Sequence, residues 1–332
     1  MPNLRDIEKR INSVSSTKQI TRTMEMVATA KIRRATDRMV AATPYSNSMI
    51  EMLAYVASRL EGVESPLLQK HDEVNNVLII VVASDRGLAG GFNSNVFRYV
   101  ERLKNEKEAQ GASVELAACG KKSIGYFTYR KIQPVLEFRD LSADPTPEQA
   151  HTLAAYAMGG FIDGSIDEVI VVYNHTKNAA EQILREELIL PLDEDFLEGQ
   201  ALAAFGGEKA TSAHAGDASA VAAQTIIDSA RSSAQEADAE NDVSRHGDIL
   251  FEPDEESVLE RLLPAYVRSV IYHALIDSAA AEQGARRTAM KAATDNANEM
   301  VESLSRVYNR VRQGAITTQI TEIVGGAAAM EE

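Results

Sequence analysis

The last quarter of the chain limits its fold more than any other feature. From about residue 257 to 324 the sequence keeps the composition and apolar spacing of one very long helix. Asp254 is a suitable N-cap for it, and Glu255 and Glu256 suit the positive end of the helix dipole. At ~1.5 Å per residue such a helix would be on the order of 100 Å long. No compact domain of this size needs such a helix.

A solitary helix of that length buries too little surface to form a stiff element, so it requires a partner along its flank. Its predicted contact stripe, with a spacing nearer to 3.6 residues than to a heptad, is Ala289, Ala293, Asn296, Met300, Leu304, Val307, Val311, Ala315 and Thr318. Residues 1–60 contain a comparable stripe: Leu4, Ile7, Ile11, Val14, Ala28, Ile32, Ala35, Met39, Ala42, Tyr45, Met49, Met52 and Val56. We therefore predict an antiparallel coiled coil between segments 1–60 and 252–328, with a single helix at one end because the second segment is longer.

Two irregularities are expected in this coil. Polar Lys18, Thr21 and Glu25 fall on seam positions, which predicts a phase shift at which the helix faces something different. The displaced apolar set in that window is Ile20, Met24 and Val27. In addition, Pro44 and Pro264 each remove a helical hydrogen bond and are expected to kink their helices without necessarily ending them.

The middle of the chain, residues 75–192, alternates between strand and helix patterns. Strands are predicted at residues 77–83, 113–118 and 169–173, and helices at 93–107, 121–129 and 147–161. Such alternation predicts a small Rossmann-like domain with a parallel sheet. The expected fold class is therefore α/β, with this domain inserted between the two halves of the coiled coil.

Residues 193–248 differ from the rest because they contain 14 Ala and carry twelve acids against three bases. We expect a largely disordered acidic insertion there. The net charge of -15 argues against a general nucleic-acid binder, although residues 1–40 carry nine Lys or Arg against four acids. This local excess favours an acidic partner for the first helix.

Other residue patterns exclude several classes of protein. The only cysteine, Cys119, permits no intrachain disulfide and is expected to be a buried strand residue. The N-terminus lacks the apolar region of a secretory signal, and no stretch approaches ~18 uninterrupted apolar residues, so we expect no direct membrane span. The six histidines show no metal-ligand spacing, and no catalytic signature is present. We predict neither a metal nor a cofactor.

The sharpest local motif is Asp85-Arg86-Gly87-Leu88-Ala89-Gly90-Gly91, directly after the first predicted strand. Gly-rich turns at this place in a parallel sheet often bind phosphate. This motif, however, does not match G-x-G-x-x-G and is not followed by a Walker Lys-Ser/Thr. Residues 120–123 resemble the end of a P-loop, but Glu115 stands where Gly is required. A structural turn is favoured over a nucleotide site.

Three groups of segments, in order along the chain, carry a family resemblance. They are residues 11–14, 18–21 and 24–28; the motif at 85–91; and residues 289–296, 312–313, 316–317, 321–324 and 327–329. Together they resemble the gamma subunits of bacterial F-type ATP synthases, over nearly everything except 193–248. The insertion is longer than that family's usual connection, and Ala89 stands where many members have Cys.

The resemblance implies a non-catalytic central-stalk rotor subunit, coupling proton flow through a membrane ring to ATP synthesis in a catalytic head by rotation. Its partners would be the alpha and beta subunits of that head, the epsilon subunit and the membrane c-ring. The chain would lie peripherally at the cytoplasmic side of the cell membrane. Residues 38–45 and 251–254 would lie near the ring and epsilon.

The resemblance also implies contact residues along the rod. Met24, with basic neighbours Lys31 and Arg286, would face an acidic segment of the catalytic subunit. Arg312, Gln313 and Thr317 would hydrogen-bond to a loop of that subunit. The apolar tip would rest in a bearing formed by the head, through Ile316, Ile320, Ile323, Val324 and Met330.

From the residues alone, two other classes of protein remain possible. A coiled-coil scaffold would keep the long helices but bind filaments or vesicles. A nucleotide-dependent α/β enzyme would require the Gly-rich turn to bind phosphate.

Overall fold

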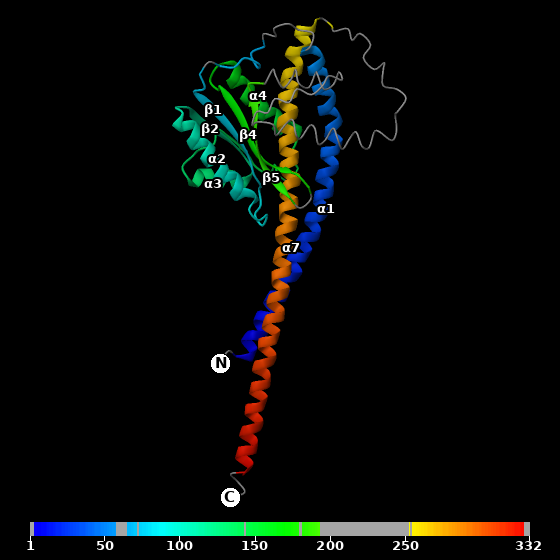
Figure 1. Ribbon diagram of the computed structural model, residues 1–332, viewed down its shortest axis with the longest axis vertical. Helices are drawn as coiled ribbons and strands as arrows, with labels where there is room; N and C mark the ends of the chain where they lie inside the picture. The colour runs from blue at the N-terminus through cyan, green and yellow to red at the C-terminus, as the bar shows by residue number, and fades with distance from the viewer. Residues whose placement is uncertain are drawn as a thin grey trace, which may run out of the picture.

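The computed structural model describes residues 3–57, 65–71, 73–142, 144–178, 181–192, 252 and 254–328. Two long helices, α1 (Leu4–Ala57) and α7 (Glu255–Ala328), form an antiparallel rod, and a sheet-containing domain lies beside one end of it (Figure 1). The predicted fold class is confirmed. The predicted disordered insertion at 193–248 lies outside the described residues.

Helix α7 has 74 residues, so it is about 110 Å long. It begins as predicted, because the backbone N–H of Ser257 donates to Oδ1 of Asp254 over 2.7 Å. Neither Pro44 in α1 nor Pro264 in α7 ends its helix. Each helix therefore continues through its proline, as expected, and the predicted kinks stay predictions.

Two hydroxyl pairs that join the helices show the register of the coil. The Oγ1 atoms of Thr21 and Thr294 lie 2.7 Å apart, and the Oγ atoms of Ser46 and Ser269 lie 3.0 Å apart. In an antiparallel coiled coil, the residue numbers of facing positions add up to the same value as long as the register is unchanged. The two pairs have the same sum, so α1 and α7 keep a single register between them. The predicted phase shift at 18–25 is therefore wrong.

The seam of α1 is an uninterrupted heptad pattern in which every member is buried or half-buried. Its members are Leu4, Ile7, Ile11, Val14, Lys18, Thr21, Glu25, Ala28, Ile32, Ala35, Met39, Ala42, Ser46, Met49, Leu53 and Val56. Polar residues hold seam positions in the window of the expected break. Two members of the expected displaced set turn outward instead, since Ile20 is 61% exposed and Val27 is 51% exposed, while Met24 is half-buried. Tyr45 and Met52, predicted to lie in the seam, are also exposed.

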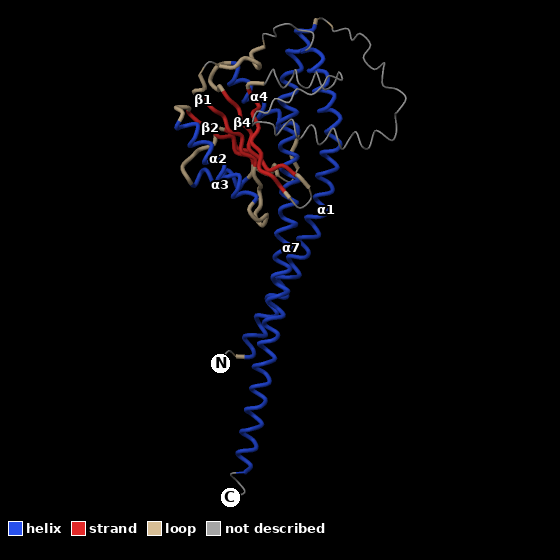
Figure 2. Tube along the Cα trace, in the orientation of Figure 1, coloured by secondary structure: helices blue, strands red, loops and turns tan. Residues whose placement is uncertain are grey.

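The α7 seam likewise follows heptads rather than the straight-helix spacing that we expected. Its buried or half-buried members past residue 289 are Met290, Thr294, Ala297, Val301, Leu304, Tyr308, Val311 and Ala315. The predicted Asn296, Met300 and Val307 are exposed. The reason is that two helices supercoil around each other, which keeps residues spaced by 3.5 at the contact. The crossing of the helices is visible in Figure 2.

The sheet has five strands in the order β3-β2-β1-β4-β5. The strands β1 (Asn76–Val82), β2 (Ser113–Cys119), β3 (Leu136–Phe138) and β4 (Glu168–Thr176) are parallel, and β5 (Gln182–Leu190) is antiparallel to β4. The three predicted strands are confirmed. Sequence reasoning missed β3, which has three residues, and β5, whose centre is the charged run Arg185, Glu186, Glu187.

The helices α2 (Phe92–Ala109), α3 (Lys121–Tyr129) and α4 (Pro147–Ile162) confirm the three predicted helices. The first two cover one face of the sheet, around Val81, Val96 and Phe127. The opposite face is covered by α4, by the end of α1 and by α7. Cys119 is completely buried in β2, as expected.

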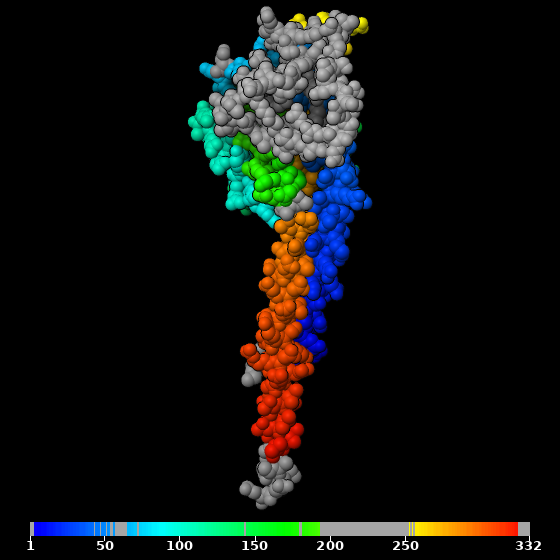
Figure 3. All heavy atoms as spheres, turned by 45° about the vertical axis from the view of Figure 1, so that its right-hand side comes forward, coloured from blue at the N-terminus to red at the C-terminus, as the bar shows by residue number. Residues whose placement is uncertain are grey.

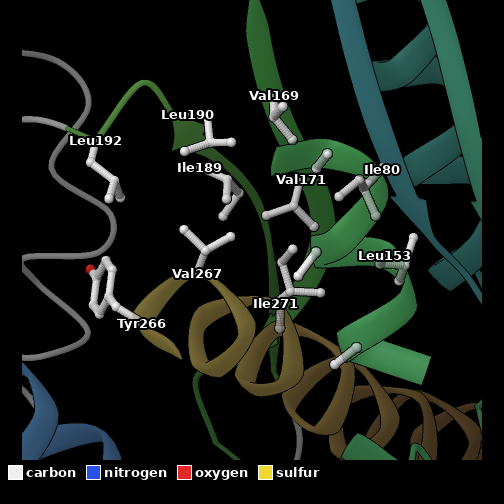
Figure 4. Close-up of a cluster of buried hydrophobic side chains, with 14 of the residues drawn as sticks. Ile80, Leu153, Val169, Val171, Ile189, Leu190, Leu192, Tyr266, Val267 and Ile271 are labelled. Atoms are coloured by element: carbon white, nitrogen blue, oxygen red, sulfur yellow. The ribbon is translucent and has the colours of Figure 1, made fainter. Parts of the chain in front are cut away.

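Helix α7 belongs to the core of the domain as well as to the rod. Figure 4 shows Val267 and Ile271 of α7 directed at Val171 of β4 and at Ile189 and Leu190 of β5. All five side chains are at most 2% exposed. The domain and the rod are therefore joined through a shared apolar core and not through a flexible linker.

Candidate functional site

The carboxyl edge of the sheet is where a Rossmann-like domain would bind a ligand. From β1 the chain passes first to β2 and β3 on one side and later to β4 on the other, which creates a topological switch point between β1 and β4. Helix α7 runs past this point, and its Ala281 packs with Ala89 and Phe92, which follow β1. The rod itself lies against the place where a nucleotide would be expected.

Asp85 occupies an anion-binding position at this edge. Its Oδ1 accepts the backbone N–H of Lys121, at the start of α3, over 2.9 Å and that of Asp140 over 3.0 Å. Its Oδ2 accepts the N–H of Ser142 over 2.9 Å. Partial burial acts to raise the pKa of Asp85, but these hydrogen bonds hold it below its ordinary value. The carboxylate therefore takes the place at the start of α3 that a phosphate would take.

Asp277 of α7 caps the end of β4 in a similar manner. Its completely buried carboxylate accepts the backbone N–H of Thr176 over 2.9 Å through Oδ1. Its Oδ2 lies 2.5 Å from Nδ1 of His175. The same helix presents His273 one turn earlier, and burial lowers the pKa of this imidazole. Sequence reasoning missed Asp277, because nothing in a helical pattern shows that a carboxylate faces a strand end.

The Gly-rich turn at 85–91 is used for packing. The guanidinium of Arg286 donates to the carbonyl of Gly87 over 3.3 Å, and an added Cβ on Gly90 would lie 3.8 Å from Cβ of Ala289. The adjoining Gly120 has a φ of +96°, and a Cβ there would lie 2.2 Å from the carbonyl oxygen of Ala83. These contacts support the structural interpretation of the motif, since the chain's own carboxylates and helix occupy the crevice.

The predicted rod contacts Met24, Lys31 and Arg286 do not form one exposed cluster. Lys31 is exposed and Met24 is half-buried. Arg286 is 9% exposed, and its Nη2 lies 2.5 Å from Oε1 of Glu282 in addition to its bond with Gly87. The structure thus gives Arg286 an internal role at the junction of rod and domain, while Lys31 is accessible to a partner from solution.

A groove of about 430 Å³ lies along the coil at the level of the Thr21–Thr294 pair. Its walls carry three basic side chains, Lys18, Arg22 and Lys291, together with the acids Glu25 and Asp295. The excess of positive charge suits an acidic surface.

The far end of α7 is a single helix with exposed apolar side chains. Beyond Val311 it extends past the start of α1 (Figure 3). Arg312, Gln313 and Thr317 are exposed there. The apolar residues of this tip are Ile316 at 47% exposure, Ile320 at 56%, Ile323 at 71% and Val324 at 62%. Met330 lies outside the described residues. Such a row of exposed apolar side chains is typical of a surface that another protein covers.

Comparison with known proteins identifies the family. The family profile described as ATP synthase matches residues 3–330. The ATP synthase gamma chain of Leptospira biflexa is 37% identical over 326 residues, which cover 98% of both chains, and that of Anaeromyxobacter sp. strain K is 37% identical over the full length of both. The chain belongs to the ATP synthase gamma family.

Solved structures share the fold of this chain. A chain of the Euglena gracilis mitochondrial ATP synthase, in an OSCP/F1/c-ring structure, matches with a TM-score of 0.60 and 18% identity, covering 98% of this chain and 94% of that one. A chain of the Tetrahymena thermophila central stalk and c-ring structure matches with a TM-score of 0.51 and 22% identity, over 82% and 99%. These likenesses show the fold.

Two further searches concern the part of the chain that the structure describes. None of its helices has an apolar stretch sufficient to cross a membrane. Within the same residues, no group of three or more His, Cys, Asp or Glu side chains is arranged to hold a metal ion.

Proposed function

We propose that this gamma-family chain is a non-catalytic rotating shaft. It couples proton movement through a membrane c-ring to ATP synthesis in a head of alpha and beta subunits, and it lies peripherally at the cytoplasmic side of the cell membrane. The observation that carries the proposal is the tip of α7, where one unaccompanied helix exposes Ile316, Ile320, Ile323 and Val324. Exposure of these apolar side chains to water is unfavourable, whereas contact with an apolar bearing would bury them.

The junction between rod and domain suits the transmission of torque. Because Val267 and Ile271 are in the same core as the strands, a force on the domain reaches α7 through close-packed atoms. The domain end would meet the c-ring and the epsilon subunit, near residues 38–45 and 252–254. Residues 251 and 253, predicted to share this contact, lie outside the described residues.

Rotation would act on the head because the shaft is asymmetric. The domain lies on one side of the rod, and the outward residues Ile20 and Val27 lie on one face of α1. A head of three catalytic subunits would then meet a different surface in each, and each subunit would favour a different nucleotide state. This asymmetry does not require a register break at residues 18–25.

The basic groove supports the predicted contact with an acidic segment of the catalytic subunit. Lys18, Arg22 and Lys291 line it, and Met24 and Lys31 lie on the same helix as the first two. Arg286 would contribute indirectly, by holding the turn at 85–91 in place, because its guanidinium contacts Gly87 and Glu282 of the same chain. Arg312, Gln313 and Thr317 would provide polar contacts just before the bearing.

The proposal is tested by purifying a tagged chain from its native membranes and assaying proton-coupled ATP synthesis. An ATPase should co-purify, and truncation after Gln313 should uncouple it. A matched control replaces the polar tip residues Thr318, Gln319 and Thr321 by Ala, which should leave coupling intact. A chain that purifies with filament or vesicle proteins would favour the scaffold alternative. Binding of ATP to the isolated chain in equilibrium dialysis would favour the nucleotide-dependent enzyme.

We also propose that the insertion at 193–248 regulates rotation and is dispensable for assembly. Its acidic, Ala-rich composition and its position between β5 and α7 motivate the proposal. Deleting it should leave the purified complex with its full set of subunits but change its rate of ATP hydrolysis. Loss of assembly on deletion would contradict the proposal.

A further inference from the structure

The middle of the coiled-coil seam alternates alanine with larger side chains. Near the domain, the α1 seam carries the large residues Leu53 and Val56, both at 0% exposure. Between Thr21 and Ser46, alanine holds every second seam position of α1, at Ala28, Ala35 and Ala42, and the larger residues Glu25, Ile32 and Met39 hold the others. Alanine fills little of the hole that a facing helix offers, so those three layers specify register less strongly than layers with large side chains.

The two hydroxyl pairs lie at the two ends of this stretch. Thr21 is 9% exposed and Thr294 is 7% exposed, so their 2.7 Å contact is shielded from water. Each also lies near a carbonyl of its own helix, that of Lys18 at 3.0 Å and that of Met290 at 2.9 Å. Since each hydroxyl has one hydrogen, one threonine donates across the seam and the other donates to its own helix.

Sliding by one heptad would keep the seam face of each helix but would separate both pairs. In one direction Thr21 would face Val301 and Thr294 would face Ala28, neither of which can hydrogen-bond through its side chain. In the other direction Thr21 would face Arg287 and Thr294 would face Val14. Either slip breaks the hydrogen bonds that cross the seam. The threonine hydroxyls can still donate to carbonyls of their own helices, but the hydroxyl oxygen that accepted across the seam loses its donor unless Arg287 replaces it, which is unfavourable.

We propose that the Thr21–Thr294 and Ser46–Ser269 pairs fix the register of the shaft and prevent α1 from sliding along α7. A single polar pair in an otherwise apolar seam is known to select register in coiled coils. The inference follows from the geometry of the coil and holds whether or not the chain rotates. Under the proposed function, the same pairs would keep the shaft at a constant length while it carries torque.

Disulfide formation between introduced cysteines can report the register. Each cysteine pair used here contains the Ala280→Cys substitution. Ala280 lies opposite Ala35 in the native register, so Ala35→Cys with Ala280→Cys reports that register. After a one-heptad slip, the thiol introduced at position 280 would face position 28 or position 42 instead. Ala28→Cys or Ala42→Cys, each with Ala280→Cys, therefore reports the two slipped registers. The natural Cys119 is completely buried, and burial raises the pKa of its thiol to about 12, so it should not react.

The test introduces Thr21→Val and Ser46→Ala into each cysteine pair of the full-length chain and measures disulfide formation under mild oxidation. We expect the slipped pairs to form disulfides about two- to tenfold more than in the parent chain for each hydroxyl pair removed. The matched control is Thr23→Val with Ser48→Ala. Both residues are exposed on α1, and the Thr23 hydroxyl donates to the carbonyl of Gln19 in its own helix.

Two further variants separate the effect of the hydroxyl pairs from a failure to fold. Thr21→Ser retains the hydroxyl and should restore the native pattern. Thr21→Val alone leaves the Ser46–Ser269 pair in place and serves if the double variant does not fold. If the valine variants give the same disulfide pattern as the Thr23/Ser48 control, the hydroxyl pairs do not set the register and the proposal is wrong.

Discussion

The buried carboxylate of Asp277, in the longest helix, accepts the backbone N–H of Thr176 at the end of β4. This contact is one of those that join the shaft to the edge of the sheet. The side chain of His175 lies against the other oxygen of the same carboxylate. In an enzyme of similar topology, this edge would be open to a ligand.

Replacing Asp277 by Asn should destabilise the chain by about 1–3 kcal/mol. The amide would keep an oxygen for one donor but would lose the negative charge beside His175, and its NH₂ group would need a new acceptor in a buried site. Chemical unfolding followed by circular dichroism measures the loss. Asp144→Asn, which removes only the exposed ion pair with Arg38, is the control and should change stability by less than about 0.5 kcal/mol. Equal effects of the two changes would contradict the capping role.

Replacing Asp85 by Asn should lower stability by about 1–2 kcal/mol at neutral pH, because the backbone N–H groups at the start of α3 favour a charged acceptor. Partial burial opposes ionisation, but the hydrogen bonds keep the folded-state pKa of Asp85 below the ordinary value of 3.8. Its contribution is therefore present above pH ~3.8 and is lost as pH falls through the folded-state value.

A pH series from 7 to 3 on the Asp85→Asn variant and the parent chain checks this sign. The difference in unfolding free energy should be constant at pH 5–7 and should shrink below pH ~4. Asp140→Asn, which loses only an exposed ion pair with Lys121, should show no such shrinkage. A difference that grows on acidification would show that the sign is wrong.

Gly120→Ala should prevent the domain from folding normally or cost more than about 3 kcal/mol. Its φ of +96° disfavours any side chain, and the new Cβ would lie 2.2 Å from the carbonyl oxygen of Ala83. Gly125→Ala, within the adjoining helix α3, is a matched control, since an added Cβ there meets nothing within 4 Å, and it should stabilise by about 0.5–1 kcal/mol. Thermal unfolding of both variants measures the contrast, and similar midpoints would contradict the close approach.

Replacing His273 by Gln should reduce the sensitivity of the chain to mild acid. Burial lowers the folded-state pKa of His273 below 6.5, and the neighbouring His175 and Arg185 act in the same direction while Asp277 opposes them. The folded state is therefore penalised as pH falls from about 6.5 through the lower folded-state value.

Midpoints of thermal unfolding between pH 7.5 and 5 test this expectation. The parent chain should lose more stability over that range than His273→Gln, whereas His151→Gln, at an exposed position of α4, should behave as the parent does. Parallel curves for all three chains would exclude His273 as the responsible group.

The sequence by itself determined the long helices, the strands β1, β2 and β4 and the family. These depend on local periodicity, on continuous apolar runs and on motifs that are visible without knowing contacts. Even the exposed tip follows from the sequence, because one helical segment is longer than the other. Asp254 was identifiable as a cap because capping residues act on their own helix.

Only the tertiary structure decided the register of the coil and whether the crevice at the carboxyl edge of the sheet is open or filled. Thr21 looked like an error in the seam because its partner, Thr294, lies in a distant segment of the chain. The same is true of Asp277, whose role depends on which strand end α7 passes, and of β5, whose charged centre is recognisable as a strand only beside β4. Polar groups in a seam, a crevice or an edge strand are satisfied by partners remote in sequence, and a local pattern does not contain those partners.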